Sequence, residues 1–211
     1  CPGGDFAMDA PENATWSHEL STALAPWPKE IEVLRFGVPP IVDKSEMEEA
    51  YGPLASYLED KLGVPTHLVQ PDSYSSLAQG VQEGKIDLAL FTAASYVEAK
   101  KHSTGLQVIL KQVSNGSSFY LGYIFSNAAL PVSELEDLRG RSICFVDPLS
   151  TSGYLYPRMI FRKRGMDPDT VFSKVEMGGN HLACIYKVLA GECDAGAVWA
   201  GAFTLARDAG K

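Results

Sequence analysis

Short apolar runs alternate with helical patterns along most of the chain. Within 46–62, apolar residues recur every three to four positions, as they do on one face of an α-helix: Met47, Tyr51, Leu54, Leu58 and Leu62. The same spacing predicts further helices at 74–83, 95–101, 154–164 and 181–190. Apolar runs predict strands at 31–38, 66–69, 86–91, 106–113, 119–125, 142–146, 170–176 and 195–199. This repeated strand–helix order favours an α/β fold with largely parallel strands.

The first 29 residues differ from the rest in composition. Prolines at positions 2, 11, 26 and 28 and glycines at positions 3 and 4 suit a loosely packed leader or tether. The chain is long enough for two small lobes. The strand at 119–125, with the segment 127–131 after it, is the predicted crossover between them. We therefore predict a leader at 1–29, a first lobe at 30–125 and a second lobe at 126–211.

Composition and charge exclude several classes of protein. Hydrophobic residues make up 45% of the chain and charged residues 21%, as in an ordinary globular protein, and no apolar run approaches the ~20 residues that span a bilayer. The net charge of −8 argues against nucleic acid as a partner, because binding it requires a basic surface. The four cysteines lack the paired spacing of a zinc site, so we expect neither a metal nor a cofactor.

One strand-to-helix turn has an unusual density of hydroxyl groups. It runs from Asp147 to Gly153 and contains Ser150, Thr151 and Ser152. The first amides of a helix have no internal partner and carry partial positive charge. Three hydroxyls beside them add further donors, so this turn is suited to hold an oxyanion without a cationic side chain. The alternative is an ordinary N-cap, which needs only one such hydroxyl.

Several motifs occur together in the order of a known family. The clearest runs Phe145-Val146-Asp147-Pro148 and then Ser150-Thr151-Ser152-Gly153-Tyr154; others lie at 84–89, 95–99, 136–141, 179–181 and 191–198. Between residues 36 and 198 these motifs resemble the phosphonate/phosphate-type substrate-binding proteins of ABC importers. The resemblance implies a bilobal type II periplasmic-binding-protein fold, a ligand in the cleft between the lobes, and ABC permease subunits as partners.

The resemblance also indicates ligand-binding residues. Carried over onto this sequence, they are Ser150, Thr151, Ser152, His181, Tyr120 and Tyr74. Interior packing is the alternative role for the two tyrosines, and a solvated helix cap is the alternative for the histidine. Members that bind aminoalkyl phosphonates carry a carboxylate where this chain has Gly201. We therefore expect a small ligand without an ammonium group: phosphate, phosphite or a short alkylphosphonate.

The two ends of the sequence carry further expectations. Because the sequence opens on Cys1 and a Pro-Gly stretch, we expect a bacterial lipoprotein that is acylated at Cys1 and anchored to the membrane on the periplasmic or extracellular face. Members of the resembling family return to the first lobe after the second. This sequence stops at Lys211, so we expect the C-terminal return to be missing.

Taken together, these features predict an extracytoplasmic solute-binding component of an ABC transporter that captures a small phosphorus oxyanion. Two alternatives stay open: a ligand sensor or interaction protein on the same fold, and a relative that binds sulfonate or sulfate. A carboxylate near the anion would reject those fully deprotonated ligands, and Asp147 is the local candidate. An enzyme that uses Ser150 or Ser152 with His181 is not expected, because the sequence lacks a nucleophile motif such as Gly-x-Ser-x-Gly.

Overall fold

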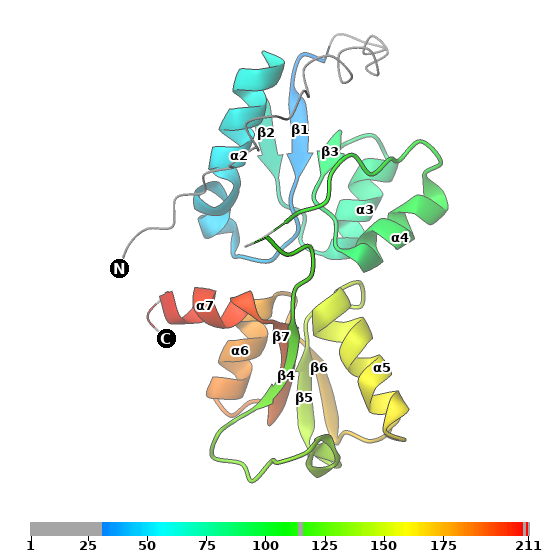
Figure 1. The fold of residues 1–211 in the computed structure, drawn as a ribbon, viewed down its shortest axis with the longest axis vertical. Coiled ribbons are helices and arrows are strands. Elements are labelled where there is room, and N and C mark those ends of the chain that lie inside the picture. The colour runs from blue at the N-terminus through cyan, green and yellow to red at the C-terminus, as the bar shows by residue number, and fades with distance from the viewer. Residues whose placement is uncertain (1–30, 114–115, 209, 211) are drawn as a thin grey trace. The chain divides into compact units, whose positions relative to one another are not determined.

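Two β-sheets organise the described part of the chain, which comprises residues 31–113, 116–208 and 210 of a computed structural model (Figure 1). The first sheet is parallel, in the order β2–β1–β3, and its strands are β1 (Leu34–Gly37), β2 (Thr66–Val69) and β3 (Leu88–Ala89). The second sheet has the order β4–β7–β5–β6, and within it β4 is antiparallel to β7. Its strands are β4 (Gly122–Ser126), β5 (Ser142–Phe145), β6 (Lys174–Met177) and β7 (Ala195–Trp199).

Helices alternate with these strands along the chain. Between the strands of the first sheet and after them come the short turn η1 (Lys44–Glu46), α2 (Met47–Leu62), α3 (Tyr74–Gln82) and α4 (Ala93–His102). The second sheet is accompanied by η2 (Leu135–Leu138), a π-helical turn η3 (Thr151–Leu155), α5 (Tyr156–Lys163), α6 (His181–Leu189) and α7 (Gly201–Asp208). The predicted α/β fold class is confirmed.

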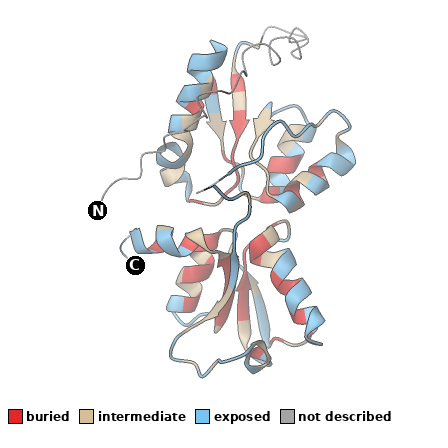
Figure 2. Ribbon diagram, in the orientation of Figure 1, coloured by how far each residue is buried: buried red, intermediate tan, exposed pale blue. Residues whose placement is uncertain are grey.

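The second sheet is covered on both faces. On one face Phe145 of β5 belongs to an apolar cluster with Phe161 of α5, and on the other Cys144 belongs to a cluster with Leu182 of α6. Buried residues therefore follow one another along β5 and β7 (Figure 2), which explains why both strands are apolar at successive positions. Because β5 and β7 are parallel neighbours, the turns that follow them emerge at the same edge of the sheet.

Not every predicted element is present. The strand predicted at 106–113 is wrong, because the segment is irregular and most of its apolar side chains are exposed, with Leu110 84% accessible. The predicted strand at 119–125 begins only at Gly122, and the one at 86–91 is reduced to β3. An apolar run has the right side chains for a strand, but a strand also needs a neighbour to pair with its backbone.

The predicted division of the chain is only partly covered by the described residues. The leader at 1–29 lies outside them, as does Cys1. Residues 33–211 form one compact unit. The boundary at 125/126 stays a prediction, and most of β4, which it assigns to the first lobe, pairs with β7 of the second sheet. Within the described ranges, no helix has both the length and the apolar character needed to cross a membrane.

Candidate functional site

The hydroxyl triplet lies at the end of β5, where the chain enters η3. Ser150 is the N-cap residue of this turn, and its Oγ accepts a hydrogen bond from the amide of Gly153 at 3.1 Å. The amide of Leu155 donates to the carbonyl of Ser150 at 3.0 Å, an i→i+5 bond that widens the helix at its start. Such π-helical turns are rare and are found frequently at functional sites.

The members of the triplet differ in environment. Ser150 and Ser152 are buried, and so is the Asp147 carboxylate that precedes them. Thr151 is half-buried, and its Oγ1 accepts a hydrogen bond from the amide of Ala94 at 3.2 Å. That amide belongs to the first turn of α4, so the amino-terminal ends of α4 and η3 meet here. The partial positive charges at the amino-terminal ends of these two helices are therefore close together.

Thr92 joins the same two turns by a second contact. As the N-cap of α4, it accepts a hydrogen bond from the amide of Ser95 at 3.2 Å, and its hydroxyl donates to the carbonyl of Leu149 at 3.0 Å. The residue was not among those predicted. Its capping role is readable from the sequence, but its bond to a residue 57 positions away is not.

Tyr74 opens α3 and is fully buried, with a relative accessibility of 0%. Its hydroxyl has no hydrogen-bond partner among the described residues. Burial raises the pKa of Tyr74 well above its usual value, and the neighbouring Asp147 carboxylate raises this pKa further. The Ser150 hydroxyl approaches the Tyr74 hydroxyl, without forming a well-aligned hydrogen bond, and lowers this pKa in part. Tyr74 thus lies near Ser150; its complete burial in an apolar cluster also fits interior packing, and its role as a ligand residue stays a prediction.

Tyr120 lies just before β4 and is exposed, with a relative accessibility of 56%. Its phenol is near enough to Tyr74 to contribute to the raised pKa of that residue. The two predicted tyrosines therefore approach one another from different elements, one fully buried and one accessible. Interior packing, the alternative role for both, does not describe Tyr120.

His181 begins α6 and is buried, with a relative accessibility of 3%. Its Nδ1 accepts a hydrogen bond from the backbone amide of Trp199 at 3.3 Å, which assigns the proton of the neutral ring to Nε2. Burial lowers the pKa of His181 to about 4, so the ring is neutral at pH 7 and serves as a donor through Nε2. The alternative of a solvated helix cap is wrong for His181, whereas His67 and His102 are exposed.

Asn180 positions His181 from outside the site. Its Oδ1 accepts a hydrogen bond from the amide of Ala183 at 2.7 Å, and its Nδ2 donates to Asp43 at 3.2 Å. We expect Asn180→Ala to lower the free energy of unfolding by about 1 kcal/mol, because an N-cap is lost. Asn180→Ser keeps a cap acceptor without placing a second carboxylate beside Asp43 and should retain most of this stability. Urea unfolding of both variants tests this, and equal stability of the alanine variant and the wild type would contradict it.

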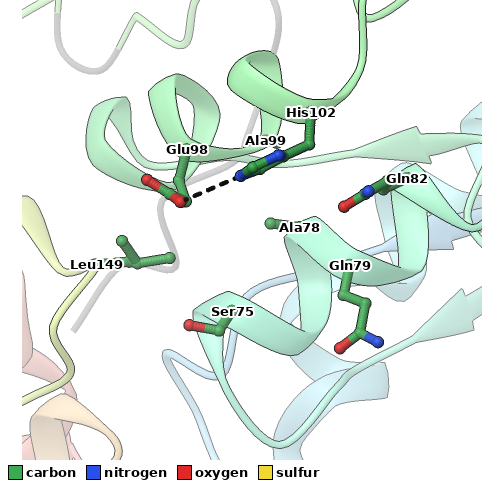
Figure 3. A pocket seen from close by; sticks show the side chains of 8 residues that line it. All are labelled: Ser75, Ala78, Gln79, Gln82, Glu98, Ala99, His102 and Leu149. Carbon is green, nitrogen blue, oxygen red and sulfur yellow. Dashed lines mark ion pairs between the residues drawn. The ribbon is translucent and has the colours of Figure 1, made fainter.

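A cavity of about 250 Å³ lies elsewhere, between α3 and α4 (Figure 3). The six predicted ligand residues do not line it; its walls are Ser75, Ala78, Gln79, Gln82, Glu98, Ala99, His102 and Leu149. The Glu98 carboxylate on this wall is paired with Lys101 at 2.7 Å and with His102 at 3.7 Å. The predicted oxyanion site is therefore distinct from this cavity.

Comparison with known proteins places the chain among transport proteins. Residues 36–211 match the family model for the phosphonate periplasmic substrate-binding protein of ABC transporters. The chain is 31% identical over 176 residues to the phosphate-import protein PhnD of Mycolicibacterium smegmatis, covering 78% of this chain and 54% of the relative. It is 29% identical over 144 residues to the phosphonates-binding periplasmic protein of Escherichia coli, covering 65% and 43%. The chain thus spans about half the length of the curated relatives it matches.

Solved structures share the fold. PhnD1 from Prochlorococcus marinus, in complex with methylphosphonate, superposes with a TM-score of 0.74 at 22% identity, over 82% of this chain and 65% of that protein. A binding-protein component of an ABC phosphonate transporter from Pseudomonas aeruginosa also gives a TM-score of 0.74, at 21% identity, over 81% and 58%.

Proposed function

The chain belongs to the family of phosphonate periplasmic substrate-binding proteins of ABC transporters, and on this basis we propose that it is an extracytoplasmic solute-binding component. We propose that it captures a small phosphorus oxyanion, namely phosphonate, phosphite or phosphate, in a cleft between its lobes and delivers it to ABC permease subunits. Relatives named for phosphate import and for phosphonate binding support this ligand class.

One observation carries the proposal. The hydroxyl triplet at the start of η3, in which Ser150 and Ser152 are buried, lies beside the Tyr74 hydroxyl, which is buried without a well-formed hydrogen bond. Buried polar groups are normally hydrogen-bonded, so an unpartnered hydroxyl beside two helix amino termini indicates a place for an acceptor-rich ligand. The proposed ligand-binding residues are Ser150, Thr151, Ser152, His181, Tyr74 and Tyr120.

Asp147 accounts for selectivity between tetrahedral oxyanions. Its buried carboxylate accepts a hydrogen bond from the amide of Leu149 at 2.8 Å and lies close to the Tyr74 hydroxyl. A monoprotonated phosphoryl or phosphonyl group can donate its proton to such a carboxylate, whereas fully deprotonated sulfate meets only repulsion. We therefore propose that the protein rejects sulfate and sulfonates.

Isothermal titration calorimetry of the folded protein tests this function. The ligands are phosphate, phosphite, methylphosphonate, 2-aminoethylphosphonate and sulfate. Saturable binding of at least one small phosphorus oxyanion, with sulfate excluded, is the expected result. Binding of sulfate or a sulfonate in preference would favour the sulfur-oxyanion alternative. A folded protein that binds none of them would overturn the proposal in favour of an interaction role.

Thr151→Val tests the site directly. The substitution preserves the shape of the side chain but removes its hydroxyl, and a hydrogen bond to a charged group contributes about 1.5–3 kcal/mol. We expect the affinity for the bound oxyanion to fall at least roughly tenfold, while the free energy of unfolding falls by about 1 kcal/mol because the Ala94 amide loses its acceptor. Thr151→Ser keeps the hydroxyl and should bind within a few-fold of the wild type. Unchanged affinity in the valine variant would exclude Thr151 from the site.

The proposed role is transport rather than catalysis. The Oγ of Ser150 accepts from Gly153, and the Nδ1 of His181 accepts from Trp199, so neither bond joins a nucleophile to a base. The named relatives are binding and import proteins of the periplasm, which supports a periplasmic location. Anchoring through a lipid at Cys1 stays a prediction, because Cys1 lies outside the described residues.

A further inference from the structure

The indole ring of Trp199, at the end of β7, occupies the space in which a side chain at residue 201 would lie. A Cβ atom added to Gly201 would lie 2.8 Å from Cε3 of the ring and would clash more severely with Cζ3 and Cη2. The glycine therefore permits the ring to fold back over the chain.

Trp199 lies beside the residues proposed to bind the oxyanion. It is the cross-strand partner of Gly122, and a Cβ added to Gly122 would lie 3.1 Å from the Cβ of Ser152. Trp199 therefore lies at the end of β7 next to the position that adjoins Ser152, and its ring packs against the apolar cluster that contains Leu182 of α6. Its ring also makes an edge contact with the ring of His181, with centroids 6.4 Å apart and planes at 75°.

The indole Nε1–H is a buried donor without a partner among the described residues. Buried donors are almost always paired, and the indole nitrogen can only donate. The Tyr74 hydroxyl therefore lies near Ser150, and the Trp199 ring, which carries the unpartnered N–H, contacts the ring of His181. Neutral donors of this kind suit an oxyanion that lies between them.

We propose that Trp199 determines specificity at this site: its Nε1–H donates to the bound oxyanion, and its ring limits the size of the substituent on phosphorus. This inference rests on the proposed function. With the ring in place, the site accepts phosphate, phosphite and methylphosphonate. It excludes longer substituents because of their size, whether or not they carry a charge.

Two substitutions separate hydrogen-bond donation by the Trp199 N–H from the steric effect of the Trp199 ring. Trp199→Phe keeps an aromatic ring but removes the N–H, so affinity for phosphate and methylphosphonate should fall about tenfold, while the preference for methylphosphonate over propylphosphonate is retained. Trp199→Ala removes the ring and frees the volume that it fills. The preference for methylphosphonate over propylphosphonate should therefore fall at least tenfold. 2-Aminoethylphosphonate, which is close in length to propylphosphonate but charged, should follow propylphosphonate in both variants. Circular dichroism and thermal unfolding establish that each variant is folded.

A fluorescence titration gives a readout that needs no substitution at the site. The chain has three tryptophans, at 16, 27 and 199, so Trp16→Phe with Trp27→Phe leaves Trp199 as the only indole. Saturable addition of phosphate or methylphosphonate should change its emission with the same midpoint as calorimetry. Calorimetric binding without a fluorescence change, and with wild-type affinity and selectivity in both Trp199 variants, would overturn this inference but leave the proposed function intact. A folded wild-type chain that binds none of the oxyanions would overturn both.

Discussion

Replacing Gly153 with alanine is expected to lower the free energy of unfolding by about 3 kcal/mol and to abolish oxyanion binding. A Cβ atom at this position would lie 2.7 Å from the Cβ of Val146, in still closer contact with Cγ2 of that residue, and 2.9 Å from the Oγ of Ser150. Val146 is fully buried at the end of β5, and a β-branched side chain has few rotamers into which it can move. The backbone of η3 must therefore shift.

That shift would disturb the site as well as the core. The amide of Gly153 donates to Ser150 Oγ, and its carbonyl accepts from the amide of Val146 at 3.1 Å. Urea unfolding and calorimetric titration of Gly153→Ala measure the two effects. Gly105→Ala is the matched control, because a Cβ there meets no atom within 4 Å, and it should leave both quantities unchanged. A Gly153→Ala protein with wild-type stability and affinity would contradict the close packing of η3 on β5.

Acidification is expected to destabilise the protein through His181. The pKa of this residue is about 4 in the folded state and 6.5 when the side chain is free. The unfolded chain therefore binds more protons than the folded one between these values, and stability falls as the pH is lowered through this window. A shift of about 2.5 pH units corresponds to roughly 3 kcal/mol. The contribution is fully present above about pH 6.5 and lost by pH 4.

Urea unfolding between pH 4 and 7 measures this effect. His181→Gln removes the titrating group but retains an acceptor and a donor, so its stability should depend less on pH across this window. His102→Gln, at an exposed position, is the control and should follow the wild type. If stability depended equally on pH in the wild type and in His181→Gln, the burial of a neutral imidazole would be contradicted.

The carboxylate of Glu176 acts at lower pH. Lys174 and Lys187 hold the pKa of Glu176 at about 2, so its contribution to stability is lost only as the pH falls below 4.5.

The second sheet was predictable because its central strands are buried on both faces. Strands β5 and β7 lie within one residue of the ranges expected at 142–146 and 195–199. The segment 106–113 is equally apolar yet forms no strand. The difference lies in pairing: β5 and β7 are hydrogen-bonded to each other from positions 52 residues apart in the sequence. Such a partner cannot be read from local composition.

The helix predicted at 154–164 also shows that local composition does not reveal contacts within the fold. Its apolar spacing was correct for α5, but the chain enters it through the π-helical turn η3, which begins three residues earlier. The turn depends on the bond from Leu155 to Ser150 and on the close packing of Gly153 against Val146. Helix α7, which follows β7, was not predicted.

By itself, the sequence determined the α/β class, the family resemblance and the hydroxyl triplet, because helix caps and strand runs depend on residues only a few positions apart. The tertiary structure decided which other residues they contact. It brought Ala94 to Thr151, left the Tyr74 hydroxyl buried without a partner, and folded the ring of Trp199 over Gly201 beside His181. These relations depend on the packing of segments distant in sequence, which local spacing does not specify.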